Sequence, residues 1–382
     1  MKIAIVTHNI IKGDGQGRVN YELARYLASR KHEVHLYANK VDNGLLMAER
    51  ISYHHISTLV QKPKLGKNIF FIFMVGLNLL GRQYDIVHLN GAVSLLPYTI
   101  NHCHFCHSGW WIKQNGMRRE KRLINVYHRF YTWFNMQLEK LVYRRKKGII
   151  VAVSQKVKSE LIEYVKVDPQ KIFVVYNGVD ILEFSPHPKV KEIIHDEFGL
   201  NKDDFILFFA GDIATKRKGL GFVLESLSKI KDRKVKLLIA GDARRNIFKE
   251  IVEKSNLEGT VKFIGFRRDM SILLRGVDAF IFPTLYEPCG AVVLEAMASG
   301  LLIITSKLAG ASDMLSNMES GILLSNPTDT NEIKDKILLL MNNRRLKIRL
   351  GKNARRIAEN HTWDKMAEKI EGLYYAILQG KL

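Results

Sequence analysis

Short apolar segments alternate with amphipathic segments along most of the chain, and this pattern occurs twice. The apolar segments have the length of buried strands, and the segments between them repeat apolar residues at helical spacing. Such alternation predicts a doubly wound α/β fold, in which helices cover both faces of a parallel sheet. The expected strands are 3–6, 34–37, 86–88, 149–153 and 172–175 in the first series, and 205–210, 235–240, 261–264, 279–282 and 301–305 in the second.

A proline-rich segment, Ser185-Pro186-His187-Pro188, separates the two series. Neither proline can continue a helix or a central strand, which is typical of a linker. We therefore expect two Rossmann-like domains, 1–184 and 201–360, joined by a linker over 185–200. A helical segment over 361–382 closes the chain.

The charge balance indicates the kind of partner. The chain has 59 Lys and Arg against 38 Asp and Glu, a formal net charge of +21, which favours nucleic acid, an acidic membrane surface or phosphorylated ligands. Its three cysteines imply no disulfide framework and fit a reducing cytoplasm. The N-terminus does not resemble a signal peptide, and the longest apolar run, 69–80, is shorter than the ~20 residues of a membrane span. We expect a cytoplasmic protein that does not cross the membrane.

A glycine-rich turn, Gly13-Asp14-Gly15-Gln16-Gly17-Arg18, follows the first expected strand. Glycines let the backbone approach a phosphate, and the N-terminus of the next helix offers amides and a partial positive charge. The spacing is Gly-x-Gly-x-Gly rather than the dinucleotide fingerprint, and no acidic ribose-binding residue ends the second strand. The turn is a candidate phosphate site, and a flexible loop without a ligand is the alternative.

Two glutamates, Glu287 and Glu295, follow the expected strand 279–282. Glu287 lies in a turn that Pro288 and Gly290 restrict, and Glu295 lies in the second turn of the helix beginning near Gly290. Ligands bind outside the carboxyl ends of parallel strands, where a helix N-terminus favours an anion and a carboxylate can accept two hydrogen bonds from a ribose. The alternative is two surface glutamates beside an ordinary turn, since acidic residues are common there.

Three consecutive cations, Lys216, Arg217 and Lys218, follow the first strand of the second domain, between Gly211 and Gly219. Cations at a strand-to-helix turn suit a diphosphate, because its charge must be balanced before it can leave. A solvated run of charges is the alternative.

The stretch 283–310 resembles the signature of retaining family-4 glycosyltransferases of the two-Rossmann, or GT-B, type. That signature has two glutamates separated by seven residues, then Ala-Met-Ala-x-Gly, an apolar strand and a glycine. This chain matches it with Glu287, Glu295, Ala296-Met297-Ala298-Ser299-Gly300, 301–304 and Gly310. Other landmarks follow in the family's order, and the resemblance covers essentially the whole chain. It is greatest to lipopolysaccharide-core glucosyltransferases and phosphatidylinositol mannosyltransferases.

The resemblance implies a fold of two facing Rossmann-like domains with a deep interdomain cleft. The N-terminal domain would bind the acceptor and the C-terminal domain the nucleotide sugar, and the C-terminal helix would cross back to the N-terminal domain. Trp363 lies in that crossing segment.

The resemblance also assigns the donor-binding residues. Glu295 would hold the ribose, and Glu287 would contact the transferred hexose and the diphosphate together with Cys289, Gly290 and Ala291. Lys218 would neutralise the phosphates. The residues Gly15, Gln16, Gly17 and Arg18 would close over the phosphates from the first domain, and the backbone near Phe266 and Arg267 would meet the base.

One position departs from the family pattern. Many relatives have an arginine directly after the glycine that matches Gly211, whereas this chain has Asp212. Arg217 or Arg18 would compensate as the second phosphate cation.

A cluster of histidines and cysteines, His102-Cys103-His104-Phe105-Cys106-His107, allows several interpretations. Cys-x-x-Cys-His is formally a c-type haem attachment sequence, and two cysteines with a histidine are a partial zinc site. The resemblance instead places a histidine near the anomeric carbon of the sugar. We favour His104 there, with His102, His107 and Asn177 as further candidates for the acceptor side of the cleft. A purely structural role for the histidines is the alternative.

The segment 110–147 combines cations with aromatic residues. Between Lys113 and Lys147 it has eleven Lys and Arg against Glu120 and Glu139. A cationic amphipathic helix with interfacial aromatics suits docking on an anionic membrane. An ordinary helix with an aromatic inner face is the alternative. The same ingredients suit single-stranded nucleic acid, but no nucleic-acid motif accompanies them.

Together these features predict a retaining hexosyltransferase that uses a nucleotide sugar, by default a UDP-sugar, and a cell-envelope glycan or lipid-linked acceptor. His104, Glu287 and Lys218 are the expected catalytic residues. The chain contains no Asp-x-Asp, so we expect no cofactor and no metal, with cations and helix amides at the diphosphate. The protein would act in the cytoplasm, at the inner face of the membrane, and bind no nucleic acid. A nucleotide-sugar 2-epimerase of the same fold and a non-catalytic polyanion-binding protein are the alternatives.

Overall fold

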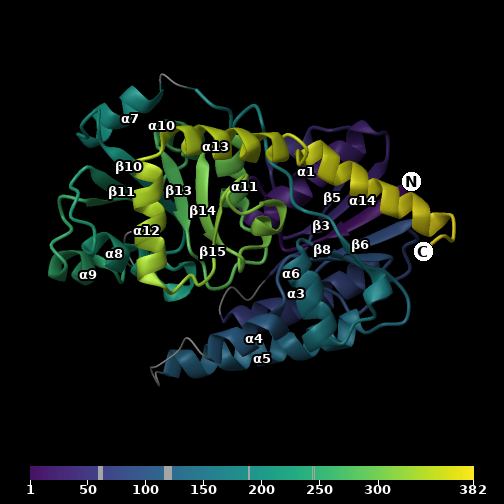
Figure 1. The fold of residues 1–382 in the computed structure, drawn as a ribbon. Helices are drawn as coiled ribbons and strands as arrows, with labels where there is room; N and C mark the ends of the chain where they lie inside the picture. Colours follow the sequence, from purple (N-terminus) through teal and green to yellow (C-terminus); the bar gives the residue numbers. More distant parts are fainter. Residues whose placement is uncertain (59–62, 116–122, 188–189, 243, 245) are drawn as a thin grey trace. The chain divides into compact units, whose positions relative to one another are not determined.

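The structure, a computed structural model, describes residues 1–58, 63–115, 123–187, 190–242, 244 and 246–382. The chain forms two compact units (Figure 1). Unit 1 consists of Met1–Gly178 and Trp363–Leu382, and unit 2 is Val179–Thr362. The first unit therefore ends before residue 184, the predicted boundary, because Val179 and Phe184 are buried in the core of unit 2.

Unit 1 is built on a seven-stranded sheet in the order β5-β3-β1-β6-β7-β8-β9, and every pair of neighbours is parallel. The predicted strands are present, and β5 and β7 are additional to them. Both contain histidine (ISYHH and INHC), which weakens the apolar pattern of a buried strand. The strands are β1 (Lys2–Val6), β3 (Glu33–Ala38), β5 (Ile51–His55), β6 (Ile86–Asn90), β7 (Ile100–Cys103), β8 (Ile149–Ala152) and β9 (Ile172–Val174), with a separate pair β2 (Asn9–Ile10) and β4 (Lys40–Val41).

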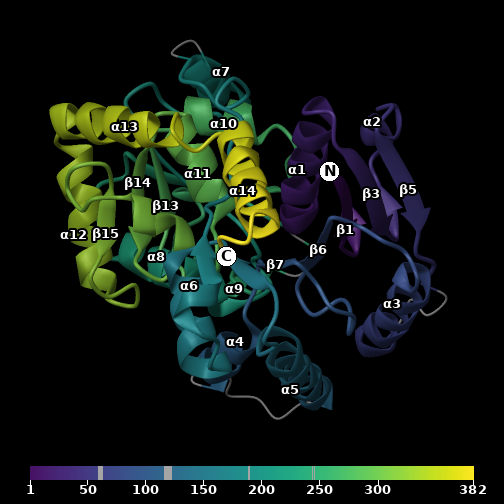
Figure 2. The ribbon, with the colours of Figure 1, turned by 90° about the vertical axis from the view of Figure 1, so that its right-hand side faces the viewer.

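Helices surround this sheet, and the last of them, α14 (Trp363–Leu378), packs against α1 (Gly15–Ser29) (Figure 2). Met366, Ile370 and Tyr374 of α14 are buried in the core of unit 1, and the Tyr374 hydroxyl lies 2.6 Å from Nδ1 of His88 in β6. The C-terminal segment is thus an integral part of unit 1. The other helices are α2 (Asn43–Leu46), α3 (Lys64–Leu79), α4 (His107–Asn115), α5 (Leu123–Tyr143), α6 (Gln155–Glu160), η1 (Leu161–Val165) and η2 (Pro169–Lys171).

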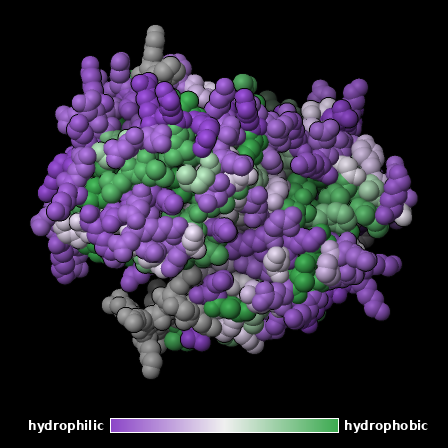
Figure 3. Space-filling view, viewed as in Figure 1, coloured by the Kyte–Doolittle hydropathy of each residue, from purple (hydrophilic) through white to green (hydrophobic). Residues whose placement is uncertain are grey.

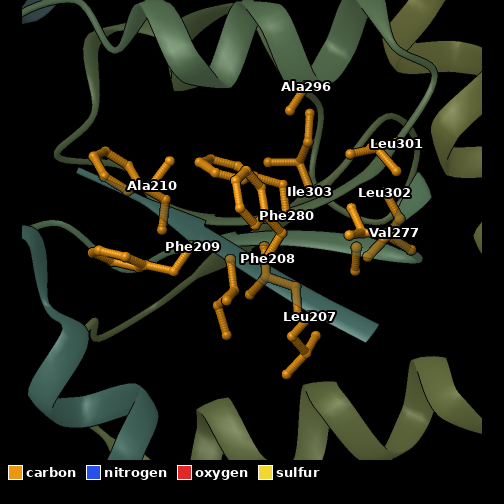
Figure 4. Close-up of a cluster of buried hydrophobic side chains, with 14 of the residues drawn as sticks. Leu207, Phe208, Phe209, Ala210, Val277, Phe280, Ala296, Leu301, Leu302 and Ile303 are labelled. Carbon is orange, nitrogen blue, oxygen red and sulfur yellow. The ribbon is translucent and has the colours of Figure 1, made fainter. Parts of the chain in front are cut away.

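Unit 2 is built on a six-stranded sheet in the order β12-β11-β10-β13-β14-β15, again parallel throughout. Phe208 and Phe280 pair across β10 and β13, and Ile303 follows on β14. Their side chains form part of one buried cluster (Figure 4). The strands are β10 (Phe205–Ala210), β11 (Val235–Ala240), β12 (Val261–Gly265), β13 (Ala279–Phe282), β14 (Leu302–Ser306) and β15 (Ile322–Leu324).

The predicted linker 185–200 is wrong over most of its length, because it contains the helix α7 (Val190–Phe198). Val190, Ile194 and Phe198 recur every four residues and are buried in the core of unit 2. The other helices of unit 2 are η3 (Lys216–Lys218), α8 (Leu220–Ser228), α9 (Lys249–Lys254), α10 (Met270–Gly276), α11 (Ala291–Ala298), η5 (Gly310–Met314), α12 (Thr330–Met341) and α13 (Arg344–Ala358).

Each sheet has a switch point, where the strand order reverses on either side of the first strand. In unit 1 it lies between β1 and β6, and in unit 2 between β10 and β13. Both units therefore have the doubly wound, Rossmann-like topology that the sequence predicts. Ligands of such folds bind outside the carboxyl ends of the strands at this point.

Hydrophilic side chains cover most of the face seen in Figure 3, with separate apolar patches between them. In the described part of the chain, no helix combines the length and the apolar character needed to span a membrane.

Candidate functional site

Two loops meet at the switch point of unit 2. The loop after β10 includes η3 and carries Arg217 and Lys218, and the loop after β13 carries Glu287. Leu285 donates its backbone N–H to the carbonyl oxygen of Arg217 at 2.8 Å, and the Thr284 hydroxyl donates to the same oxygen at 3.1 Å. The predicted phosphate cations and the first predicted glutamate therefore belong to one site.

Lys218 and Glu287 form an ion pair that is largely shielded from solvent. Arg217 lies 3.8 Å from the same carboxylate and donates to the Tyr286 carbonyl oxygen at 3.0 Å. Burial lowers the pKa of Lys218, and the positive charge of Arg217 lowers it further, whereas the contacting carboxylate stabilises the ammonium. Lys218 is thus held at the sheet edge by one carboxylate.

The turn after Glu287 is held by a second loop. Glu287 donates its backbone N–H to the Leu308 carbonyl oxygen at 3.1 Å, and Gly310 donates to the carbonyl oxygen of Glu287 at 2.9 Å. Gly290 has φ +89°, a left-handed conformation that favours glycine, directly before α11. The first amides of a helix lack partners within it, so the turn 289–291 can present N–H groups to an anion.

Glu295 is the fifth residue of α11 and is partly exposed, while the neighbouring Leu294 and Ala296 are buried. Its helix begins at Ala291, one residue after the glycine that ends the Glu287 turn. Cys289 lies in that turn and is partly exposed. Glu287, Cys289 and Gly290 thus lie on one short strand-to-helix connection, and Ala291 and Glu295 lie in the helix that follows it.

Asp212 has a local structural role. Its carboxylate accepts from the backbone N–H of Ala214 at 2.9 Å and lies 3.3 Å from the Thr215 hydroxyl. The aspartate therefore caps the turn that precedes η3. This gives a physical reason for an aspartate at this position.

Phe266 and Arg267 follow β12, which is separated from β10 by β11. The Phe266 side chain is 74% exposed. The Arg267 guanidinium is held at 2.6 Å by both Asp269 and Glu197. A contribution to a base-binding site would therefore come from the backbone here or from the Phe266 ring.

In unit 1 the residues Gly15, Gln16, Gly17 and Arg18 form the first turn of α1. This part of the glycine-rich segment is therefore helical and is not a loop that precedes the helix. A Cβ on Gly17 would lie 2.8 Å from the Ile11 carbonyl oxygen, so the close approach requires glycine. The Gln16 side chain donates to the Thr7 hydroxyl at 3.0 Å. Arg18 is 2.8 Å from Glu22 and lies over the Trp363 ring, so its charge is already partnered within unit 1.

A pocket of about 200 Å³ opens at the switch point of unit 1. His104, the predicted catalytic histidine, and His107, a predicted acceptor-side residue, line it together with Gln16. Nε2 of His104 lies 2.8 Å from Oδ1 of Asn90. The full lining is His8, Gln16, Asn68, Ile72, Asn90, Gly91, Ala92, Val93, His104, Phe105, His107, Tyr131, Asn135, Glu139 and Tyr143.

His102 and Asn177 do not line this pocket. His102 is fully buried in β7, and neither of its ring nitrogens has a hydrogen-bond partner in the described part of the chain. Its ring packs 4.1 Å from that of His104. Asn177 is buried after β9. Of the three histidines, His102 thus has the packing role that the sequence left open as an alternative.

Sequence reasoning missed several residues of the pocket, among them Asn68, Asn90, Tyr131 and Glu139. Asn90 ends β6 at the switch point. It could have been found from the rule that ligands bind outside the carboxyl ends of the strands at this point. Asn68 and Tyr131 lie on α3 and α5, where only tertiary packing brings them together. Glu139 was noted merely as one of two acids in a basic segment.

The two cysteines of the histidine–cysteine cluster are buried. Burial and the nearby Glu139 raise the pKa of both thiols, so both stay protonated. Gly109 donates its backbone N–H to Sγ of Cys106 at 3.4 Å. The described residues contain no group of three or more His, Cys, Asp and Glu side chains placed to hold a metal ion.

The basic aromatic segment forms α4 and α5. Thr132, Asn135, Glu139 and Val142 are buried along one face of α5. On its outer face Phe130 is half exposed and stacks on Trp133. The residues 116–122, which contain four of the predicted cations, lie outside the described part of the chain.

Two family models match this chain. Glycosyltransferase Family 4 matches residues 13–182, and Glycosyl transferases group 1 matches residues 190–357. Together they account for most of both units. The chain belongs to the GT-B glycosyltransferases.

Known glycosyltransferases resemble this one over nearly their full length. UDP-Gal:alpha-D-GlcNAc-diphosphoundecaprenol alpha-1,3-galactosyltransferase of Escherichia coli is 22% identical, with 96% of this chain and 95% of that enzyme covered. N-acetyl-alpha-D-glucosaminyl L-malate synthase of Bacillus anthracis is 25% identical, with 99% and 98% covered. The solved structure of WaaG, a glycosyltransferase involved in lipopolysaccharide biosynthesis, superposes with a TM-score of 0.80 at 17% identity, covering 97% of this chain and 99% of WaaG. The predicted GT-B fold and the resemblance to lipopolysaccharide-core enzymes are confirmed.

Proposed function

We propose that this glycosyltransferase transfers a hexose from a UDP-sugar to a sugar-containing, lipid-linked acceptor of the cell envelope, with retention of the anomeric configuration. The observation that carries the proposal is the site at the switch point of unit 2. There Lys218 and Arg217 both lie close to the Glu287 carboxylate. Glu287 is in the turn that precedes α11, and Glu295 is in α11 itself. Such an edge offers cations and helix amides for a diphosphate and carboxylates for sugar hydroxyls.

The donor would lie against unit 2. Glu295 holds the ribose, and Glu287 contacts the hexose. The amides of the turn 289–291 bind the diphosphate together with Lys218. Stabilising the departing UDP by fixed positive charge is then the main catalytic contribution, since it acts where negative charge develops. In unit 1, we assign His104 to the reacting sugar and the first turn of α1 at Gly15–Arg18 to the phosphates.

Support for a UDP donor and a lipid-linked acceptor comes from the E. coli relative, which its name describes as a UDP-Gal enzyme acting on alpha-D-GlcNAc-diphosphoundecaprenol. The B. anthracis relative has a small acceptor, malate, in its name. The acceptor class is therefore decided by features of this chain. Two helices of unit 1 supply them.

We place the membrane contact on the outer faces of α3 and α5. On α3, Ile69, Phe73 and Leu77 recur every four residues and are 47%, 60% and 55% exposed. An exposed apolar stripe of this kind marks an interaction surface. The half-exposed Phe130 and Trp133 of α5 add interfacial aromatics, with the exposed cations Lys64 and Arg129 beside them in sequence. An apolar stripe with cations suits shallow docking on an anionic bilayer.

The function is tested with the pure protein and a panel of UDP- and GDP-sugars, with and without lipid-linked saccharide acceptors, in EDTA. We expect a glycoside product whose anomeric configuration, read by NMR, matches that of the donor. Conversion of the donor to an epimer without acceptor would show a 2-epimerase instead. Complete loss of activity in EDTA that Mg²⁺ or Mn²⁺ restores would contradict the metal-independent part of the proposal.

A further inference from the structure

The pocket of unit 1 is formed by residues of that unit alone. The ends of β1, β6 and β7 form one side, and Asn68 of α3 and Tyr131 of α5 form another. Its volume of about 200 Å³ is below the ~300–1,000 Å³ usual for drug-sized ligands. The space suits a single small ring.

The lining is polar but carries no positive charge. Burial lowers the pKa of His8 to about 4, that of His104 to about 3 and that of His107 to about 4, so all three are neutral near pH 7. Of the described residues that line the pocket, none is Lys or Arg, although the chain as a whole has a net charge of +21. A phosphate or carboxylate entering here would lose its hydration without meeting a cation of the lining, which is unfavourable. Lys67, whose positive charge helps to lower the pKa of His8, does not line the pocket.

Glu139 strengthens this discrimination. Its carboxylate is buried in the wall of the pocket and accepts from the backbone N–H groups of His107 at 2.7 Å and Ser108 at 3.1 Å. Burial raises the pKa of Glu139 to about 8, while these donors act to lower it. When the Glu139 carboxyl group is ionised, it repels an anionic ligand. When it is protonated, it still supplies no positive charge.

The remaining polar groups match hydroxyls. Asn68 donates from its side-chain amide to the Tyr131 hydroxyl oxygen at 3.0 Å, and Asn135, which also lines the pocket, hydrogen-bonds the same hydroxyl. The Asn90 amide and the His104 imidazole are joined at 2.8 Å. Phe105 and Tyr143 supply aromatic surface. Neutral donors and acceptors beside aromatic rings recognise a ligand that is both hydroxylated and apolar on its faces.

From these observations we infer that the pocket binds one uncharged sugar ring of the acceptor and that Asn68 and Tyr131 determine its specificity. The inference rests on the proposed function and names its acceptor class. It also gives α3 and α5 a double role, because their inner residues hold the ring while their outer faces meet the membrane that carries the rest of the acceptor.

The test compares neutral and anionic sugars as ligands of the full chain in the presence of saturating UDP. Methyl glycosides of glucose, galactose and N-acetylglucosamine are the neutral probes, and glucuronic acid, glucose 6-phosphate and malate are the anionic ones. Binding is measured by saturation-transfer NMR, and UDP affinity is measured separately by calorimetry. The variants are Tyr131→Phe and Asn68→Ala, and the control is Tyr127→Phe. Tyr127 is also on α5, but its hydroxyl accepts from the backbone of Leu65 and does not line the pocket.

We expect at least one neutral glycoside to bind more tightly than every anionic probe. A hydrogen bond to a ligand contributes about 0.5–1.5 kcal/mol, so Tyr131→Phe and Asn68→Ala should each weaken this binding roughly 2- to 10-fold. Tyr127→Phe should leave it unchanged, and UDP affinity should be the same in all variants. Equal or tighter binding of an anionic probe, or unchanged binding in both pocket variants, overturns the inference. Failure of every glycoside while UDP still binds also overturns the inference and leaves the donor proposal standing, whereas failure of UDP itself contradicts the donor proposal.

Discussion

Gly219 lies so close to Pro283 that a Cβ on the glycine would overlap the proline carbonyl oxygen. Gly219 also has φ +79°, in the left-handed region. This contact fixes the loop after β10 against the loop after β13. Lys218, which precedes Gly219, and Glu287, which lies four residues after Pro283, are thereby brought together as an ion pair.

Replacing Gly219 by alanine should destabilise unit 2. The left-handed conformation costs a non-glycine residue about 1–2 kcal/mol, and the overlap adds about 1–3 kcal/mol. We expect the free energy of unfolding of unit 2 to fall by roughly 2–5 kcal/mol in urea titrations followed by circular dichroism. Gly259→Ala is the control, since a Cβ there has no neighbour within 4 Å. A variant as stable as the wild type would show that the two loops are not held in register by this contact.

The stability of unit 1 should fall as the pH drops below about 6.5. Burial lowers the pKa of His8 to about 4 and those of His88 and His104 to about 3. Between these values and 6.5, the usual histidine pKa, the unfolded chain binds protons that the folded chain does not. The stabilisation is therefore complete above pH 6.5 and is lost on acidification, by up to about 1.4 kcal/mol per pH unit for each histidine.

Tryptophan fluorescence measures this effect selectively, because Trp110, Trp111, Trp133 and Trp363 all belong to unit 1. Denaturant titrations at pH 7 and pH 5 should differ by several kcal/mol, because the three histidines together outweigh Glu139, whose raised pKa acts in the opposite direction. His8→Asn should reduce this difference in the free energy of unfolding by the contribution of one histidine. Substitution of the exposed His55 should not reduce it. Stability of unit 1 that is independent of pH in this range would show that these rings are not buried as neutral groups.

Membrane binding should depend on the apolar stripe of α3. Phe73→Asp puts a charge in the middle of the stripe, and burying an aromatic side chain contributes about 1.5–3 kcal/mol. We expect roughly tenfold or greater loss of binding to vesicles containing anionic phosphatidylglycerol, measured by co-sedimentation. Met47→Asp, which changes an exposed residue elsewhere in unit 1, is the control. Equal binding of both variants, or equal binding to neutral phosphatidylcholine vesicles, would contradict the proposed surface.

The parts of the fold with a regular pattern could be predicted from the sequence. The strands around Phe208 and Phe280 are continuous apolar runs, so their place in a parallel sheet followed directly. The strands β5 and β7 were missed, and so was α7, because the prolines before it hid the four-residue spacing of Val190, Ile194 and Phe198. Pattern alone does not distinguish a short amphipathic helix from a linker in such cases.

The site was predictable where its residues are adjacent in sequence. Glu287, Gly290 and Glu295 lie on one strand-to-helix connection, which a motif describes completely. The pairing of Asn68 with Tyr131 joins residues 63 positions apart on two helices. No local pattern encodes such a contact, because it depends on how α3 and α5 pack on the sheet.

The most direct test of the donor site is calorimetric titration of UDP and UDP-sugars into the wild type and into Lys218→Met, Glu295→Gln and the double variant of Glu287 and Glu295 to glutamine. A hydrogen bond to a charged group contributes about 1.5–3 kcal/mol, so each single change should weaken binding by tenfold or more. Lys216→Met is the matched control, because Lys216 is in the same turn but is exposed to solvent. We predict that the control binds like the wild type and that the double variant binds no nucleotide sugar detectably. Wild-type affinity in the double variant, or no binding of any UDP- or GDP-sugar to the unaltered protein, would contradict the account.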